Sequence, residues 1–208
     1  MKLQLALDRL TKKECYTILK QTSDAIDWIE IGTGVIKEYG MDIVRDMKKD
    51  FPDKVIVADM KTCDAGKHEA KQVFMAGADI TTVMGFAHNG TIKDMLEVAR
   101  ENNKRVMVDL LGIDDPKRIN EIIGLGADLL SLHIGKDMQK EGKVATQHLF
   151  DLIRGRTDVE VTVAGGINEK TINDFLQYNP SVVIVGSAIT KAEDPTGVAL
   201  CLKGMMKA

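Results

Sequence analysis

Short apolar runs alternate with longer amphipathic stretches along the whole chain. Eight of these runs have the length of a strand and are bounded by polar or glycine-containing segments, as buried strands are. We predict strands over Leu3–Leu7, Trp28–Ile31, Val55–Ala58, Ile80–Met84, Val106–Asp109, Leu129–Leu132, Val159–Val163 and Val182–Val185.

The stretches between these runs have the period of helices that bury one face. Two helix starts carry capping signals: Thr11 stands three residues before Glu14, and Asp115 directly precedes Pro116. We predict helices over Glu14–Lys20, Met41–Lys49, Glu69–Ala76, Ile92–Arg100, Pro116–Leu125, Gln147–Arg154, Glu169–Leu176 and Thr196–Met206.

Two of the predicted helices end in closely similar segments, Ala76-Gly77-Ala78-Asp79 and Leu125-Gly126-Ala127-Asp128. In each segment a glycine can close the helix before the next strand begins. We interpret the shared pattern as turn chemistry at the stabilising end of a barrel, not as a functional motif.

Strands that alternate with helices form βαβ units and a parallel sheet. Eight such units favour an α/β fold of the closed (β/α)8 TIM barrel type. An open doubly wound sheet is the alternative, but it requires no particular number of strands. The chain has 208 residues and no linker or low-complexity segment, so we predict a single β/α barrel domain over residues 1–208.

Composition indicates which binding partners and which cellular compartment to expect for this protein. The net charge is −3 with acids and bases well mixed, which argues against nucleic acid as a partner. No apolar run approaches the roughly 18 residues that span a membrane. Three widely spaced cysteines, Cys15, Cys63 and Cys201, have no metal-type spacing, and we interpret them as reduced thiols of a cytoplasmic protein.

The segment Asp59-Met60-Lys61-Thr62-Cys63-Asp64 directly follows the predicted buried strand Val55–Ala58. Strand alternation predicts that Asp59 and Lys61 point the same way, whereas Asp64 lies beyond the strand in a turn. A solvated charge cluster at a loop would also account for this segment. The functional interpretation is a site in which carboxylates set the charge state of a lysine or bind a polar substrate together with it.

Other strands end in ionisable residues as well. Asp8 ends the first strand, Glu30 lies in the second, Asp109 ends the fifth and His133 follows the sixth. In a β/α barrel these carboxyl ends meet at the face where active sites lie. Crowded carboxylates beside one lysine indicate an active site, and a divalent cation such as Mg²⁺ would relieve their repulsion.

The last two strands end in glycine-rich segments instead. Gly165 and Gly166 follow the seventh strand, and Gly186 and Ser187 follow the eighth. Glycines let backbone N–H groups approach an anion, and these two loops often bind phosphate in this architecture. We therefore predict phosphate binding by Gly165, Gly166, Gly186 and Ser187, and a phosphorylated sugar as the ligand.

These residues carry a family resemblance. The chain resembles the orotidine monophosphate decarboxylase suprafamily, whose signature Asp-x-Lys-x-x-Asp is matched in full by Asp59 to Asp64. Within it the chain is most similar to the 3-hexulose-6-phosphate synthases. Supporting segments include Gln4–Asp8, Ile29–Thr33, Val108–Leu110, His133–Gly135, Ala164–Gly166 and Ile184–Ile189.

The resemblance implies a barrel of the ribulose-phosphate-binding type that catalyses an aldol condensation. D-Ribulose 5-phosphate and formaldehyde would give D-arabino-hex-3-ulose 6-phosphate through a Mg²⁺-stabilised enediolate. Glu30 and Asp59 would hold Mg²⁺, His133 would be the base and Lys61 would donate to the developing oxyanion. Asp8, Asp109 and Lys136 would contact substrate. In the family the second motif aspartate, here Asp64, comes from the partner subunit, which implies a homodimer with shared active sites.

Three alternatives stay open. 3-Keto-L-gulonate-6-phosphate decarboxylase shares almost every motif, but typically has arginine where this chain has Lys136 and glutamate where it has Asp109. A ribulose-phosphate epimerase would carry metal-binding histidines on several strands, whereas here only His133 stands at a strand end. A non-catalytic sugar-phosphate-binding protein would not need the complete charged motif with a histidine.

Overall fold

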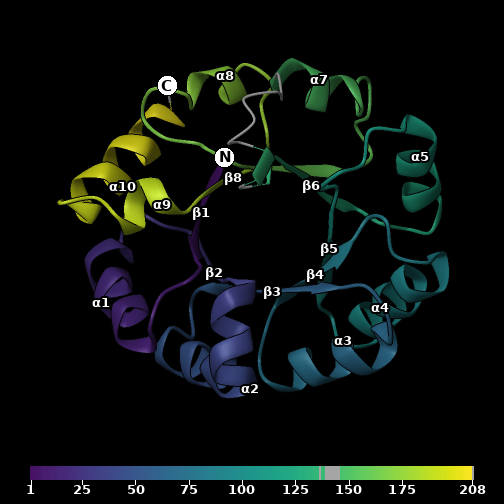
Figure 1. Cartoon of the computed structure of the whole chain (residues 1–208), viewed down its shortest axis with the longest axis horizontal. Coiled ribbons are helices and arrows are strands. Elements are labelled where there is room, and N and C mark those ends of the chain that lie inside the picture. The colour runs from purple at the N-terminus through teal and green to yellow at the C-terminus, as the bar shows by residue number, and fades with distance from the viewer. Residues whose placement is uncertain (136, 139–145, 208) are drawn as a thin grey trace.

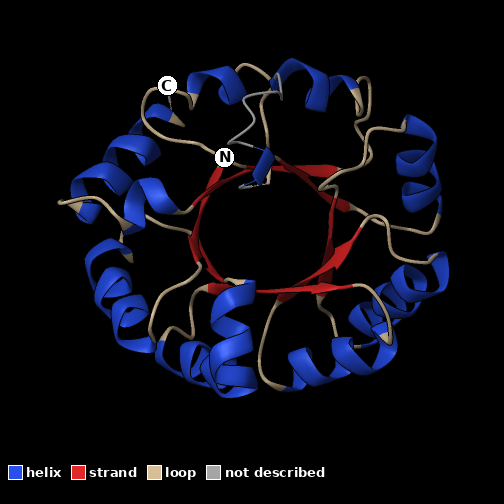
Figure 2. Cartoon of the chain, in the orientation of Figure 1, coloured by secondary structure: helices blue, strands red, loops and turns tan. Residues whose placement is uncertain are grey.

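Eight parallel strands close into a barrel in the computed structural model, with the helices in a ring outside it (Figures 1 and 2). Neighbouring strands follow chain order, and β8 pairs with β1 to complete the closure. The structure describes residues 1–135, 137–138 and 146–207. The strands are β1 Lys2–Leu7, β2 Trp28–Ile31, β3 Val55–Thr62, β4 Ile80–Met84, β5 Arg105–Asp109, β6 Leu129–His133, β7 Glu160–Ala164 and β8 Val182–Val185. The predicted TIM barrel is confirmed.

The helices follow the strands in the order that a β/α barrel requires. None of those described is long and apolar enough to cross a membrane. They are α1 Lys12–Thr22, α2 Thr33–Asp50, α3 Gly66–Met75, α4 Asn89–Glu101, α5 Pro116–Gly124, α7 Thr146–Asp151, α8 Asn173–Leu176, α9 Ser187–Thr190 and α10 Pro195–Met205.

Helix boundaries differ most from the sequence prediction in three places, and the ends of the other helices differ by up to three residues. Helix α2 begins at Thr33 rather than Met41, and Gly40 (φ 62°) interrupts it, so the apolar period was visible only after this break. Helix α8 is only four residues long, because the Asn168 side chain accepts from the backbone N–H of Lys170 and forms a turn where the helix was predicted to begin. Helix α9 replaces an expected loop after β8.

Local capping chemistry sets other boundaries as predicted. Thr11 and Glu14 form a complete capping box at the start of α1, and the Asp115 carboxylate accepts from the backbone of Lys117 at the start of α5. Gly77 and Gly126 follow their helices with φ of 104° and 97°, a conformation that glycine adopts without strain.

The barrel interior becomes more polar from the layer that contains Trp28 toward the carboxyl ends of the strands. Strand register and alternation place inward-facing side chains in layers of four from alternate strands. The layer that contains Trp28 and Leu129 is apolar, whereas the two layers nearest the carboxyl ends of the strands carry Glu30, Asp59 and Asp109. The layers, in order, are Trp28, Ile80, Leu129 and Val182; Gln4, Val57, Met107 and Thr162; Glu30, Thr82, Ser131 and Ile184; and Ala6, Asp59, Asp109 and Ala164.

Candidate active site

A cavity of about 660 Å³ opens at the carboxyl ends of the strands. It extends from the polar layers of the barrel to the loops after β7 and β8. Ten of the twelve site residues predicted from the sequence line it: Asp8, Glu30, Asp59, Lys61, Asp109, His133, Gly165, Gly166, Gly186 and Ser187. Lys136 lies outside the described residues, and Asp64 is exposed and does not line this cavity.

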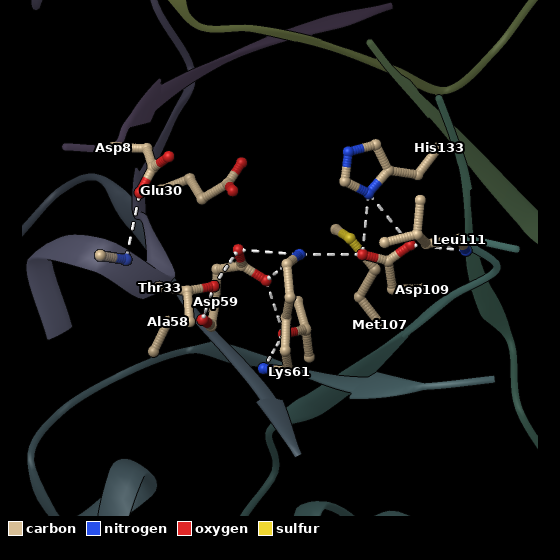
Figure 3. Close-up of polar contacts among 12 residues, drawn as sticks. Asp8, Glu30, Thr33, Ala58, Asp59, Lys61, Met107, Asp109, Leu111 and His133 are labelled. Atoms are coloured by element: carbon tan, nitrogen blue, oxygen red, sulfur yellow. Dashed lines mark hydrogen bonds and ion pairs between the residues drawn. The ribbon is translucent and has the colours of Figure 1, made fainter. Parts of the chain in front are cut away.

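A continuous chain of polar contacts crosses the cavity from β3 to β6 (Figure 3). The Lys61 Nζ lies 3.0 Å from the carboxylate of Asp59 and 3.0 Å from Oδ2 of Asp109. Asp109 Oδ2 lies 2.9 Å from Nδ1 of His133, and its Oδ1 accepts from the backbone N–H of Leu111 at 2.9 Å. Three strands therefore contribute to one network, as the strand-end positions predicted.

The two aspartates fix the charge of the lysine. Burial opposes the charge of the Lys61 ammonium, but Asp59 and Asp109 together outweigh it and raise the pKa of Lys61 above its ordinary range. Burial likewise opposes the charge of Asp109, but His133 and Lys61 outweigh it and lower the pKa of Asp109 to about 2. Lys61 is therefore a protonated hydrogen-bond donor at neutral pH and not a nucleophile.

His133 is oriented by Asp109. Because Nδ1 contacts the Asp109 carboxylate, Nε2 lies on the opposite side of the ring, away from Asp109 (Figure 3). Burial alone would lower the pKa of His133, but the bond to Asp109 outweighs it, so the pKa is raised above its ordinary value. A histidine that is held in this way is a suitable proton acceptor for a ligand in the cavity.

Glu30 has fewer compensating contacts than Asp109. Its Oε2 accepts from the side-chain amide of Gln4 at 2.6 Å. Burial and the negative charge of Asp59 raise the pKa of Glu30 to about 7, which means that its ionised form lacks sufficient positive charge nearby. The buried Oε1 of Gln4 has no hydrogen-bond partner among the described residues.

Asp59 is held by two hydroxyl groups that the sequence analysis did not identify. The hydroxyl of Thr33 lies 2.8 Å from Oδ2 of Asp59, and the hydroxyl of Thr82 lies 2.8 Å from its Oδ1. Thr82 could have been found from strand alternation, since it faces inward from β4 beside β3. Thr33 carried no such signal, because its position depends on where α2 begins.

Asp8 lies at the rim of the cavity. Its Oδ1 accepts from the backbone N–H of Gly34 at 3.1 Å, and its Oδ2 pairs with Arg9 at 3.1 Å. The Asp8 side chain is 42% exposed, so the ion pair is open to solvent and to ligand. Asp8 thus anchors the first turn of α2 as well as lining the cavity.

The glycine-rich loops lie at the other side of the same cavity. Gly165 has φ of 115°, and a side-chain carbon there would lie 2.4 Å from the backbone oxygen of Ile134. Gly166 also has positive φ (68°), and Gly186 precedes the first turn of α9. Three basic residues that the sequence analysis did not single out line this cavity as well: Arg9, Lys37 and Lys191.

Asp64 lies in the loop between β3 and α3. It is exposed and is not among the described residues that line the cavity of its own subunit. The next residue, Ala65, has φ of 52° and directs the chain into α3. Asp64 therefore does not join the network formed by the first two members of its motif.

The described residues contain no cluster of three or more His, Cys, Asp or Glu side chains that would form a preassembled metal site. Glu30 and Asp59 nevertheless fit a hard divalent cation. Mg²⁺ usually binds through one or two carboxylates and completes its shell with water or substrate oxygens. A cation beside them would also favour the ionised form of Glu30, which the protein alone does not stabilise.

Comparisons with known proteins show the family to which this chain belongs. The chain matches the Orotidine 5'-phosphate decarboxylase / HUMPS family over residues 1–200. It is 37% identical over 207 residues to 3-hexulose-6-phosphate synthase from Bacillus subtilis (strain 168), with 99% of each chain covered. The crystal structure of 3-hexulose-6-phosphate synthase from Salmonella typhimurium matches at 38% identity with a TM-score of 0.96, covering 100% of this chain and 99% of that one.

The structure of a second enzyme is also similar. The crystal structure of 3-keto-L-gulonate-6-phosphate decarboxylase from Vibrio cholerae O1 biovar El Tor matches at 27% identity with a TM-score of 0.86, covering 99% of this chain and 97% of that one. Identity is thus higher to the synthases over a similar share of the chain. The chain belongs to the orotidine 5'-phosphate decarboxylase / HUMPS family.

Proposed function

We propose that this protein is a 3-hexulose-6-phosphate synthase, a lyase that joins D-ribulose 5-phosphate and formaldehyde into D-arabino-hex-3-ulose 6-phosphate. One observation carries the proposal: a protonated Lys61 lies between Asp59 and Asp109, with His133 bound to Asp109, beside a cavity that reaches the glycine loops. Full-length similarity to synthases supports the same assignment.

The reaction begins with proton removal from C1 of ribulose 5-phosphate, next to the ketone. His133 accepts this proton at Nε2, because its Nδ1 is engaged by Asp109. The C1 carbanion equivalent then attacks the formaldehyde carbon, so that a C–C bond forms and the C=O double bond becomes a single bond. The new alkoxide takes up the proton that His133 had accepted, so that product and base are both neutral again.

Negative charge develops on the substrate oxygens during proton removal. Lys61 donates a hydrogen bond to this charge, and its two aspartates keep it protonated throughout. Glu30 and Asp59 would hold Mg²⁺, which when bound would stabilise the same negative charge as a Lewis acid. Asp8 would orient the sugar hydroxyl groups from the rim of the cavity.

The phosphate group would bind at the glycine loops. Gly165, Gly166, Gly186 and Ser187 bring backbone groups close to the cavity wall, where a side chain at Gly165 would collide with Ile134. Lys191 lines the cavity near Ser187 and adds positive charge. Phosphate binding at this end would place C1 of the sugar toward the network of Lys61 and His133.

The active enzyme would be a homodimer. Asp64 is exposed in its own subunit and does not line its own cavity, as expected of a residue that completes the site of a partner. Each site would then combine Asp59 and Lys61 of one subunit with Asp64 of the other. The distribution of the motif over two chains would make a lone subunit incomplete.

The decarboxylase reaction is the second candidate, supported by the similarity to 3-keto-L-gulonate-6-phosphate decarboxylase. Asp109 favours the synthase, since the decarboxylases typically have glutamate there. A direct comparison tests both: purified protein with Mg²⁺ is supplied with ribulose 5-phosphate and formaldehyde, and separately with 3-keto-L-gulonate 6-phosphate. Hexulose phosphate formation at the higher kcat/KM supports the proposal, whereas faster CO₂ release overturns it.

A further inference from the structure

The pairing of β3 with β4 is irregular at the motif. Ala58 pairs with Thr81, and the next pair along the strands is Thr62 with Val83. Strand β3 therefore has three residues between these pairs where β4 has only Thr82. The surplus is a β-bulge, a feature that is common beside active sites and changes the direction of a side chain.

Lys61 lies within this bulge and has a left-handed backbone. Its φ is 49°, a conformation that lysine adopts rarely and that is maintained only by its surroundings. Regular strand alternation is therefore not what brings Lys61 beside Asp59. The sequence prediction was right about the side on which the two residues lie, but the bulge is the cause.

One hydroxyl group contacts both ends of the bulge. The Thr82 Oγ1 donates to Oδ1 of Asp59 at 2.8 Å and accepts from the backbone N–H of Lys61 at 2.9 Å. A hydroxyl has one donor and two acceptor positions, so both bonds can form at once. The Thr82 residue is 4% exposed, which leaves little water to replace either bond.

We propose that Thr82 is the positioning residue that holds the Asp59 carboxylate and the left-handed Lys61 backbone in their reactive arrangement. The proposal deepens the proposed function and rests on it for the consequences in turnover. Thr33 cannot take this part, because its hydroxyl contacts Asp59 but not the backbone of Lys61. Without the Thr82 hydroxyl, the Lys61 N–H loses its acceptor and the bulge can relax toward regular strand pairing.

The chain offers a matched control on the same strand. Thr81 is also buried and its hydroxyl contacts the backbone oxygen of Ala58 at 3.2 Å, but it faces away from the cavity. Thr81→Val and Thr82→Val therefore remove the same group from neighbouring positions of β4. Thr82→Ser keeps the hydroxyl and removes only the methyl group.

Two measurements test the proposal, each on the full-length protein after its fold is checked by circular dichroism. Thr82→Val should lower kcat by about 10–100-fold, as loss of a residue that orients a ligand group does, while KM for ribulose 5-phosphate changes less than about threefold. Hydrogen exchange of the Lys61 amide should become at least about tenfold faster. In Thr82→Ser, kcat and the exchange rate of the Lys61 amide should stay within about fivefold of wild type. In Thr81→Val, neither should change by more than about threefold.

The amide measurement needs no substrate and no metal, so it decides the proposal even if the wild-type protein proves not to be a synthase. Full protection of the Lys61 amide in Thr82→Val would by itself overturn the proposal. Equal damage from Thr81→Val or from Thr82→Ser would overturn it as well. If Thr82→Val does not fold, Thr82→Ala and Thr82→Ser form a second pair that differs only in the hydroxyl.

Discussion

Partly buried carboxylates have opposite surroundings at the two ends of the barrel. At the amino ends of the strands, Asp79 contacts Lys48 at 2.9 Å and Lys104 at 2.7 Å, and accepts from the backbone N–H of Ile56. At the carboxyl ends, Glu30 accepts a hydrogen bond from the neutral amide of Gln4 and faces the negative charge of Asp59.

The pKa values of the two carboxyl groups are therefore shifted in opposite directions. Burial opposes the charge of Asp79, but its backbone bond and two lysines outweigh it and lower its pKa. Burial and Asp59 instead raise the pKa of Glu30 to about 7. The first end is therefore arranged for the stability of the folded chain. The second retains an excess of negative charge that a cation and a substrate can use.

The largest effect should come from the base. His133→Asn should lower turnover by about 10²–10⁴-fold, because it removes the proton acceptor while leaving a side chain of similar polarity. Exchange of the C1 proton of ribulose 5-phosphate with solvent, followed by NMR without formaldehyde, measures this step alone. A normal exchange rate in the variant would assign proton removal to another group.

A comparable effect is expected at the motif, and it tests the shared site. Lys61→Ala and Asp64→Ala should each lower turnover by about 10²–10³-fold, the cost of losing one charged or hydrogen-bonding group at a reacting centre. Mixing the two inactive proteins should restore activity, because one site of each heterodimer receives an intact Lys61 and the partner's Asp64. Random exchange would restore at most about one site in four. A mixture that stays inactive after proven subunit exchange would place the action of Asp64 within its own chain.

A smaller effect should appear in the pH dependence. The bond to Asp109 outweighs burial and raises the pKa of His133, and a base acts only when unprotonated. Wild-type kcat/KM should therefore rise with pH, and the midpoint of this rise should lie above the ordinary pKa of histidine. Asp109→Asn removes the negative charge beside His133, so the midpoint of this rise should move to lower pH. The maximal rate should fall as well. An unchanged midpoint would mean that the rise in kcat/KM reports the titration of another group.

The smallest effect on catalysis should come from the opposite end of the barrel. Asp79→Asn removes a carboxylate with two lysine partners and should lower the free energy of unfolding by about 1–2 kcal/mol at pH 7. Because the pKa of Asp79 is lowered in the folded state, this difference should shrink as the pH falls through that pKa. kcat should stay within about twofold. Asp128→Asn is the control, since its ion pair with Arg105 is exposed and contributes little. A large loss of kcat in Asp79→Asn would remove the distinction between the two ends.

Much of the architecture could be predicted because strands that are buried on both faces are continuous apolar runs. The positions of Asp59, Asp109 and His133 followed from the rule that such strands end at one face. The left-handed backbone of Lys61 could not be predicted, since it depends on a mismatch between β3 and β4 that appears only when the strands pair.

The contacts that hold the site residues in place could not be predicted from the sequence either. Thr82 is an ordinary inward-facing residue of β4 until its neighbour on β3 is known. The pairing of Asp109 with both Lys61 and His133 required the closed barrel, because these residues come from three different strands. Local sequence patterns therefore predicted the helices, the strands and the residues at the strand ends. The hydrogen bonds and ion pairs among those residues depend on how neighbouring strands pair.

In the proposed function Glu30 and Asp59 bind Mg²⁺, and the carboxyl group of Glu30 offers the most direct test of this site. Glu30 has a pKa of about 7 in the folded protein against 4.5 in the unfolded chain, so the folded state binds more protons between these values. Stability contributed by this residue is therefore lost as the pH rises from about 4.5 to about 7, and it stays lost above that range.

Thermal unfolding at pH 8, with and without Mg²⁺, tests this claim in wild type and Glu30→Gln. Without Mg²⁺ the variant should be the more stable protein by about 1–3 kcal/mol, and the difference should shrink toward pH 5. Mg²⁺ should stabilise the wild type and have little effect on Glu30→Gln. Equal stabilisation of both proteins by Mg²⁺, together with no gain from the substitution at pH 8, would contradict Mg²⁺ binding by Glu30.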